Sequence, residues 1–516
     1  MTMYMMRKED ESDARKQYFP LFPMQRGKMR SSRVLRLIAL AVVIVFLTYW
    51  IFSVAYMWVQ IATTWLILFS SLDCAFSEEP EPEPSPKDNE DIPLKQEIPA
   101  EWREMCEFLE REWQGEEGQI DDGRFRLRGV AVVFRHGERS PLYTEDDEAG
   151  CEPFREQDRE DFKNYKKLME SDDFNYFLNT DVKFANFSKI PSLAHCSAGQ
   201  MTAEGALQHV KFGNYMRDRY LDSNIFSPDS RLNVTVTSSR YNRTFQSAIA
   251  FTSAFLFPSK SSVPQIHVQA SNFTFLCTSR NCACNTRRWR AQFEKERYEY
   301  FVQRSPVHLQ KEADLVRTHS AFSHAMDPFQ ILDVALGRYV CRRKPLPCFG
   351  RSYCLNYEFL SQLLNETTTR KKVMFDEGSR YVVEKMNLVE AHGVLYHIAE
   401  TIANLRRFPH TNTIQIFSGH DVTLAPILIV LKVPFIDPPH YASRLVIEFY
   451  ELVDSPSTKD GIFLRFLYNG KDVTKDVFFC ETELNNGLCP GQKLERFVHN
   501  EIFLPLNVNS LIEVCS

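Results

Sequence analysis

The sequence predicts an α/β protein in which a sheet core carries a mostly helical second part and is preceded by one transmembrane helix. Two observations predict the core. Short apolar runs of strand length end in polar residues, and apolar residues then recur at helical spacing. A third observation predicts the membrane helix, because residues 37–72 contain no formally charged side chain.

The uncharged run is long enough to cross a membrane. As a helix it would extend roughly 54 Å at about 1.5 Å per residue, which exceeds the ~30 Å hydrocarbon core of a bilayer. No Gly, Pro or charge marks a turn within residues 37–72, so a single tilted span with an interfacial extension is favoured over a hairpin. A buried soluble helix is disfavoured because such helices need a polar face.

The charges that flank this run predict its orientation. Basic residues precede it: Arg26, Lys28, Arg30, Arg33 and Arg36. Acidic residues follow it: Asp73, Glu78, Glu79, Glu81 and Glu83. Because basic flanks stay on the cytosolic side, residues 1–36 are expected to be a cytoplasmic tail and residues 37–72 a type II signal anchor. A cleaved signal peptide fits poorly, because both the charged leader and the apolar stretch are too long.

Composition changes twice after the anchor. Residues 77–99 are rich in Pro and Glu and hold few large apolar side chains, so this segment cannot bury enough surface to fold. We therefore expect a disordered stem over residues 73–105. Residues 106–516 are expected to form one folded luminal domain.

Cysteines and glycosylation sequons support an extracytoplasmic domain. Of the 13 cysteines, only Cys74 lies beside the anchor, and the other 12 lie beyond it, an even number that suits disulfides. Two clusters of three cysteines lack the paired C-x2-C spacing of zinc sites, so disulfides are favoured there over metal: Cys277, Cys282, Cys284, Cys341, Cys348 and Cys354. Five N-x-S/T sequons lie on the same side, at Asn186, Asn233, Asn242, Asn272 and Asn365.

The core elements follow in chain order. Strands are predicted at 130–134, at 232–239 and at 413–417, and the second and third run into helical patterns. A further helix is predicted at 201–221 with Thr202 as its N-cap. The mostly helical second part is expected to come from around residues 144–230 and 275–400.

Charge and motifs exclude several functions. The net charge of −6 gives no nucleic-acid signature, and no nucleic-acid partner is expected. The sequence has no G-x-x-x-x-G-K loop and no dense cluster of Asp, Glu and His for a two-metal site. We therefore expect chemistry without a metal or other cofactor.

All three predicted strands end in residues that bind or process an anion. Arg135, His136 and Arg139 follow the first, Arg240 and Arg243 the second, and His420 and Asp421 the third. In open α/β sheets, sites form beyond the carboxyl ends of the strands. Arginine forks suit phosphoryl oxygens, and a neutral histidine can attack phosphorus. Arg240 is placed outside the core site, because it can equally pair with a surface acid.

These residues resemble the histidine acid phosphatases. Arg135, His136, Gly137, Arg139 and Pro141 match the R-H-G-x-R-x-P signature of that family. The stretches "GQMTAEGALQHVKFGNYMRDRY", "NRTFQSA" and "SGHDVTLAPIL" resemble its other conserved blocks. The resemblance covers nearly everything beyond residue 125 and implies a mixed sheet flanked by helices, with an inserted helical cap.

The resemblance also implies a role for each site residue. His136 is the expected phosphorylated nucleophile and Asp421 the proton donor. The expected phosphate ligands are Arg135, Arg139, Arg243 and His420. Two departures stand out: Asn242 replaces the usual Asp before the third arginine, and Glu138 also gives the R-H-G-E of phosphoglycerate mutases.

Three features narrow the resemblance to a Golgi branch of the family that removes phosphate from xylose in the proteoglycan linkage region. They are the type II anchor, the stretch "LRFLYNGKDVT" at 464–474 and the cysteine pattern. This implies a Golgi membrane location with the catalytic domain in the lumen, a phosphorylated glycan substrate, and glycosyltransferases of the same pathway as partners. The alternatives are a general luminal or lysosomal acid phosphatase and a catalytically silent glycan-binding protein.

Some residues that share these patterns are expected to play other parts. His195, His209 and His392 are expected to pack or cap rather than to react. Asn242 is expected to stay unglycosylated, because Arg243 beside it should face the phosphate pocket. The expected glycosylation sites are therefore Asn186, Asn233, Asn272 and Asn365.

Overall fold

A computed structural model covers the chain of 516 residues. It describes residues 97–143, 151, 155–193, 196–222, 231–257, 265–271, 276, 284, 286–349, 353–374, 380–453, 461–482 and 484–515. Within these ranges, no helix combines the length and apolar character needed to cross a membrane. The predicted anchor at 37–72 lies outside the described residues.

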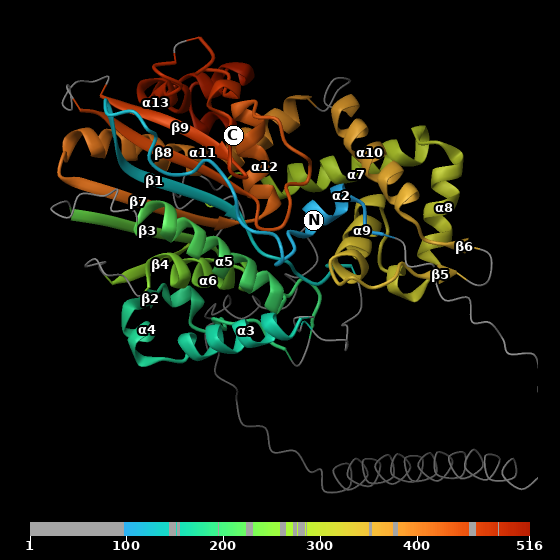
Figure 1. Ribbon diagram of the computed structural model, residues 1–516. Helices are drawn as coiled ribbons and strands as arrows, with labels where there is room; N and C mark the ends of the chain where they lie inside the picture. Colours follow the sequence, from blue (N-terminus) through green and yellow to red (C-terminus); the bar gives the residue numbers. More distant parts are fainter. Residues whose placement is uncertain are drawn as a thin grey trace, which may run out of the picture. The chain divides into compact units, whose positions relative to one another are not determined.

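A mixed sheet forms the centre of the fold (Figure 1). In the described part of the chain its strands are β1 (Phe125–Arg135), β2 (Leu178–Thr180), β3 (Arg231–Ser239), β4 (Ile266–Ser271), β7 (Thr411–Gly419), β8 (Arg444–Leu452), β9 (Ile462–Tyr468), β10 (Lys471–Asp472) and β11 (Cys489–Pro490). Their order is β10-β9-β8-β1-β7-β3-β4-β2, and β11 pairs with β9. The pairs among β1, β7, β3, β4 and β2 are parallel, and β8, β9 and β10 add antiparallel pairs.

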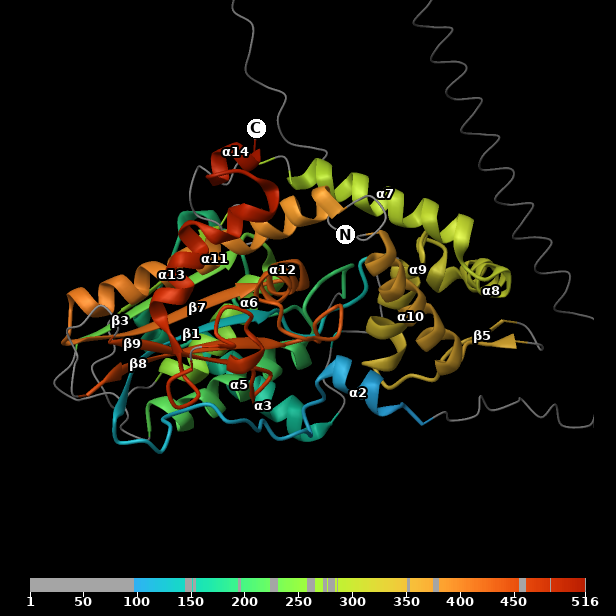
Figure 2. The same cartoon turned by 90° about the horizontal axis from the view of Figure 1, so that it is seen from above.

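Helices cover both faces of the sheet. One face carries α3 (Glu156–Met169), α4 (Asp172–Phe177), α5 (Ala203–Tyr220) and α6 (Asn242–Leu256), and the other carries α11 (Arg380–Arg407), α12 (Asp421–Leu431), α13 (Gly491–His499) and α14 (Leu511–Cys515). Figure 2 shows the strands between α11 and α13 on one side and α3 and α5 on the other. Alternation along β1 explains the two layers, because Val132 packs toward α5 and α6 and Val133 toward α11 and α12.

A separate helical part lies beside the sheet and has its own apolar core (Figure 2). It contains α2 (Ala100–Cys106), α7 (Thr286–Arg304), α8 (Val307–Arg317), α9 (Pro328–Val334), α10 (Tyr357–Met374) and the short hairpin of β5 (Cys348–Phe349) and β6 (Tyr353–Cys354). Its buried side chains include Trp102, Val316, Phe322 and Leu360. Tyr441 joins the same cluster from the chain segment between α12 and β8.

The three predicted strands and the predicted helix at 201–221 are confirmed. They correspond to β1, β3, β7 and α5, and the Thr202 side chain caps α5 by accepting a hydrogen bond from the Gly205 amide at 3.0 Å. The helices predicted after the second and third strands are α6 and α12.

The predicted extent of the helical part is wrong at two places. Within 144–230, α3 and α4 pack on the sheet, because Phe162, Tyr165 and Phe174 bury in the same cluster as the strand side chains. β2 also pairs with β4 at the sheet edge. Within 275–400, α11 lays Leu395 and Ile398 against the other face of the sheet. Amphipathic helices cannot show from periodicity alone which partner covers their apolar face.

The folded region begins earlier than the predicted boundary at residue 106. Helix α2 starts at Ala100, and Trp102 is only 1 % exposed, so these residues belong to the folded unit rather than to a disordered stem. Cys106 is bonded to Cys341. One aromatic side chain and one disulfide therefore secure the start of the domain.

The cysteines described in the structure form disulfides. The pairs are Cys106–Cys341, Cys151–Cys196, Cys284–Cys515, Cys348–Cys354 and Cys480–Cys489. Four of the six clustered cysteines are thus in disulfides, and Cys277 and Cys282 lie outside the described residues.

Candidate active site

The carboxyl ends of β1, β7 and β3 meet at one edge of the sheet, because these strands are neighbours and run parallel. Arg135 ends β1 and pairs with Gly419 at the end of β7. The next residues, His136 and His420, therefore lie side by side, with ring centroids 5.4 Å apart. Arg243 reaches the same place from the first turn of α6, after β3.

His136 is held in one tautomer. Its Nδ1 lies 2.8 Å from the carbonyl oxygen of Gly137. A carbonyl oxygen only accepts hydrogen bonds, so Nδ1 carries the ring proton and Nε2 keeps a lone pair. Burial, reinforced by the positive charges of Arg243 and Arg135, lowers the pKa of His136 well below its ordinary value. The imidazole is neutral and suited to nucleophilic attack.

Two of the site arginines lie over aromatic rings. Arg135 donates from Nη1 to the carbonyl oxygen of Pro439, and its guanidinium carbon lies 4.4 Å from the centre of the Tyr441 ring. The guanidinium carbon of Arg243 lies 5.0 Å from the centre of the Tyr241 ring. Ring contacts of this kind orient a guanidinium without neutralising it.

Arg139 is fixed from the helical part of the fold. Its Nη2 forms an ion pair with Oδ1 of Asp333 at 2.7 Å, and its Nη1 donates to the Ser140 carbonyl oxygen at 2.8 Å. Oδ2 of Asp333 accepts a hydrogen bond from the Leu142 amide at 2.7 Å. Asp333 lies on α9, so the helical part positions one of the three arginines.

Each of these arginines keeps one unsatisfied donor. The Nε atoms of Arg135, Arg139 and Arg243 are buried and have no hydrogen-bond partner among the described residues. Buried donors without acceptors are costly, so such a group is suited to an anion that supplies the missing oxygens. Burial and the like charge of Arg139 lower the pKa of Arg243 to about 10, which still leaves the guanidinium charged at neutral pH.

His420 and Asp421 begin α12 at the same edge. His420 Nε2 lies 2.8 Å from Oγ of Ser239, the last residue of β3, so the imidazole is anchored to the neighbouring strand. Burial favours the neutral acid of Asp421, but the charges of Arg135 and Arg139 outweigh burial and hold its pKa well below the ordinary value. The carboxyl group of the free protein is therefore ionised.

Glu138 does not join the reactive groups. It is buried, and its Oε1 forms an ion pair with Arg342 at 3.2 Å and accepts a hydrogen bond from Thr202 at 3.2 Å. Burial raises its pKa, against the charge of Arg342. The resemblance to R-H-G-E thus corresponds here to an ion pair between the signature loop and the segment after α9.

The other candidate residues lie as follows. Arg240 is exposed. His209 packs against Phe134 with ring centroids 4.6 Å apart, and His392 packs against Phe503 at 5.4 Å. His195 lies outside the described residues. The sequon residues Asn186, Asn233, Asn242 and Asn365 are exposed, and Asn272 lies outside the described part.

Sequence reasoning missed three residues of the site: Ser239, Asp333 and Tyr441. Ser239 had a usable signal, because it ends a predicted strand beside Arg240. Asp333 and Tyr441 had none, because one lies within a helix of the second part and the other precedes an antiparallel strand. Their position at the site depends on tertiary packing.

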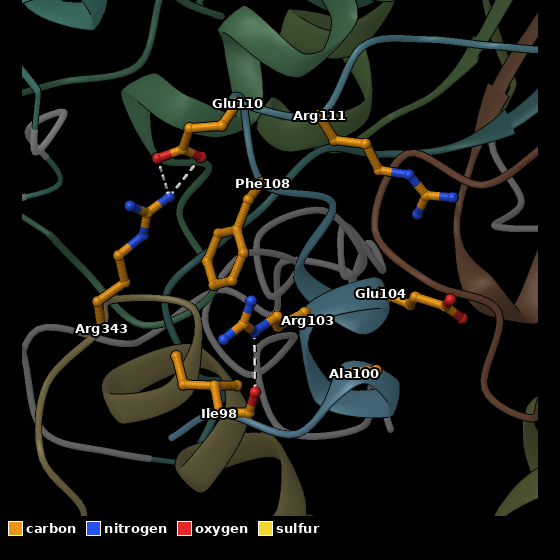
Figure 3. A pocket seen from close by; sticks show the side chains of 8 residues that line it. All are labelled: Ile98, Ala100, Arg103, Glu104, Phe108, Glu110, Arg111 and Arg343. Carbon is orange, nitrogen blue, oxygen red and sulfur yellow. Dashed lines mark hydrogen bonds and ion pairs between the residues drawn. The ribbon is translucent and has the colours of Figure 1, made fainter. Parts of the chain in front are cut away.

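A pocket of about 690 Å³ lies elsewhere, along α2 and the residues that follow it (Figure 3). Arg343 is ion-paired with Glu110 there and lies over the Phe108 ring, and Arg103 donates to the carbonyl oxygen of Ile98. The candidate catalytic residues do not line this pocket. Within the described ranges, no group of three or more His, Cys, Asp or Glu side chains is arranged to hold a metal ion.

Comparison with known proteins finds similarity to one family. Residues 126–334 match the family model of the histidine phosphatase superfamily, branch 2. The chain thus resembles this superfamily over these residues. It is 26 % identical over 406 residues to 2-phosphoxylose phosphatase 1 of Xenopus tropicalis, covering 76 % of this chain and 77 % of the relative. It is 27 % identical over 411 residues to 2-phosphoxylose phosphatase 1 of Homo sapiens, covering 74 % and 79 %.

A more distant relative is also a phosphatase. Lysophosphatidic acid phosphatase type 6 of Mus musculus is 24 % identical over 380 residues, covering 68 % of this chain and 81 % of the relative. Among solved structures, the apo phytase of Hafnia alvei matches with a TM-score of 0.41 at 13 % identity, over 73 % of this chain and 97 % of that one. The family match and the named relatives support a phosphoric monoester hydrolase.

Proposed function

We propose that this phosphatase hydrolyses its substrate through a phosphohistidine formed on His136. The observation that carries the proposal is the neutral His136 imidazole among three arginines whose buried Nε donors have no partner in the described part of the chain. A phosphomonoester dianion supplies the oxygens that those donors lack. The arginines also stabilise the charge on the phosphoryl group in an in-line transition state.

The reaction proceeds in two displacements. In the first, Nε2 of His136 attacks phosphorus, the bond to the ester oxygen breaks, and Asp421 gives its proton to the leaving alcohol. In the second, water attacks the phosphohistidine, Asp421 recovers a proton from that water, and inorganic phosphate leaves. Arg135, Arg139, Arg243 and His420 bind the phosphoryl oxygens in both steps.

The protonation of Asp421 depends on the substrate. In the free protein, the charges of Arg135 and Arg139 keep the carboxyl group ionised. A bound phosphoryl dianion offsets those charges and raises the pKa of Asp421, so the acid gains its proton as the substrate binds. A substrate monoanion can bring this proton into the site.

The proposed substrate is the 2-phosphate of xylose in the glycosaminoglycan–protein linkage region of proteoglycans. Support comes from the names of the relatives, 2-phosphoxylose phosphatase 1, at about a quarter sequence identity. The predicted type II anchor and the sequons suit an enzyme of the Golgi lumen that acts on a growing glycan. The proposed partners are the glycosyltransferases of the same pathway.

The test compares two substrates. The purified full-length chain is assayed with a phosphoxylose-containing linkage oligosaccharide and with 4-nitrophenyl phosphate. The proposal predicts a higher kcat/KM for the oligosaccharide. Higher kcat/KM for the simple ester would instead indicate a general acid phosphatase, and no turnover of either would indicate a silent glycan-binding protein.

A further inference from the structure

Tyr441 is built into the wall of the phosphate site. Its side chain is 1 % exposed, and its ring lies under the Arg135 guanidinium, with the carbon 4.4 Å from the ring centre. The ring centroids of Tyr441 and His136 are 6.1 Å apart. The backbone is tied to its surroundings on both sides, because the Tyr441 amide donates to Met105 and the Ala442 amide donates to the His136 carbonyl oxygen, at 3.2 Å each.

The hydroxyl group of Tyr441 has no partner within the described ranges. Its oxygen is buried and makes no hydrogen bond with any described residue. An unsatisfied buried hydroxyl destabilises the fold, and native interiors keep few of them. Tyr450 and Tyr220, buried in the same fold, both donate to Glu448. The unsatisfied hydroxyl therefore distinguishes Tyr441 from these two tyrosines.

The charged side chains around this hydroxyl group indicate which kind of ligand it binds. Arg139 and Arg135 act on it most strongly among its charged neighbours, followed by Asp333 and Glu138. Burial raises the pKa of Tyr441, so the hydroxyl keeps its proton at neutral pH and serves as a donor. Like the arginine Nε atoms, it is a buried donor without an acceptor among the described residues, and its ring neighbours that of His136.

We propose that the Tyr441 hydroxyl donates a hydrogen bond to the phosphoryl group bound at His136. This substrate contact is additional to the predicted ligands Arg135, Arg139, Arg243 and His420, and it rests on the proposed function. The face of the Tyr441 ring holds the Arg135 guanidinium in place, and the hydroxyl group donates a hydrogen bond to the substrate. Tyr441 thereby has two separable contributions, of which Tyr441→Phe removes only the second.

The Tyr441→Phe variant of the full-length chain tests the proposal. We expect kcat/KM for 4-nitrophenyl phosphate to fall about 10- to 100-fold, as when one donor to a developing charge is lost. Competitive inhibition by inorganic phosphate should weaken as well. The Tm without ligand should stay equal or rise, because the variant removes an unsatisfied buried hydroxyl.

Tyr450→Phe is the matched control. The Tyr450 hydroxyl donates to Glu448 at 2.8 Å and lies 2.8 Å from the Gly118 carbonyl oxygen, remote from the reactive histidine. This variant should lower the Tm and leave kcat/KM unchanged. A merely structural Tyr441 would behave in the same way, so a lowered Tm with wild-type kcat/KM and phosphate inhibition in Tyr441→Phe would overturn the proposal.

A second measurement uses the intact Tyr441. In a Tyr241→Phe background labelled with [13Cζ]tyrosine, inorganic phosphate should shift one tyrosine Cζ resonance, and the absence of any shift at saturating phosphate would overturn the contact. The outcomes also separate the two proposals. A wild-type chain that hydrolyses no phosphomonoester overturns the proposed function, whereas an active wild type with an equally active Tyr441→Phe variant overturns only the role of Tyr441.

Discussion

The backbone of Gly137 packs directly against that of Gly205. A β-carbon on Gly137 would lie 2.1 Å from the Gly205 carbonyl oxygen, and one on Gly205 would lie 2.2 Å from the carbonyl oxygen of Glu138. Both contacts are with backbone atoms, which cannot swing away. The loop that carries His136 is therefore seated on the first turn of α5, and the two glycines join two segments that are far apart in the sequence.

Replacing Gly205 by Ala should displace the His136 loop. We expect a loss of about 1–3 kcal/mol in the free energy of unfolding and a fall in kcat/KM larger than this stability loss explains. Urea denaturation and steady-state assays measure the two effects. Gly123→Ala is the control, because nothing lies within 4 Å of a β-carbon there. Equal behaviour of the two variants would show that the close packing does not position the nucleophile.

Replacing Asp421 by Asn should lower kcat more for substrates with poor leaving groups than for substrates with good ones. An alkoxide needs a proton as it departs, so kcat for an alkyl phosphate should fall about 10²- to 10⁴-fold. Nitrophenolate leaves without one, so 4-nitrophenyl phosphate should be affected far less. Comparing the two substrates under one set of conditions measures the difference, and an equal fall for both would exclude Asp421 as the proton donor.

Buried histidines should make the folded domain sensitive to acid. Burial lowers the pKa of His209 to about 3, whereas an unfolded histidine titrates near ~6.5. Below the unfolded pKa, the unfolded chain binds a proton that the folded chain does not, so stability is lost as the pH falls from 6.5 toward 3. From pH 6.5 to pH 5 this group should contribute a loss of roughly 2 kcal/mol.

The His209→Phe variant tests this acid sensitivity. Phenylalanine keeps a ring against Phe134 but does not titrate, so the free energy of unfolding should vary less with pH than in the wild type. His267→Asn is the control, because His267 is exposed. Urea denaturation at pH 6.5 and pH 5 gives the comparison. An unchanged pH dependence in His209→Phe would show that His209 does not cause the acid sensitivity.

The sequon at Asn242 should remain without a glycan. Asn242 is the first residue of α6, directly before Arg243, and a glycan there would block the approach of the substrate. Glycopeptide mapping of the chain from a mammalian secretory pathway should find Asn242 unoccupied, with the exposed Asn186 sequon as the comparison. Largely complete occupancy at Asn242 in active protein would count against Arg243 as a phosphate ligand.

The sheet was predictable from the sequence, because its central strands appear as short apolar runs that end in polar residues. Val130–Phe134 is apolar without interruption, as expected of a strand covered on both faces, and the polar residues that follow it mark the carboxyl edge. The shared edge also follows from parallel pairing, so the proximity of His136, His420 and Arg243 was predictable. The register of Arg135 with Gly419 makes this proximity close.

The remaining parts of the site depend on long-range packing. Asp333 meets Arg139 only because α9 of the helical part lies beside the segment that follows β1, and Tyr441 meets Arg135 only because the segment before β8 lies at the end of β1. The same limitation applies to α3, whose Phe162 and Tyr165 showed an apolar face but not its partner. Residue type and spacing do not predict which distant segments make such contacts.

The central claim is that the phosphoryl group is transferred from the substrate to His136 and then to water. Trapping the phosphohistidine tests this claim most directly. The wild type and His136→Ala are mixed with 32P-labelled phosphomonoester, quenched in alkaline detergent and mapped by peptide. We predict one labelled peptide in the wild type, with phosphate on His136, and no label in His136→Ala. Label on another residue, or equal labelling of the variant, would contradict the proposed mechanism.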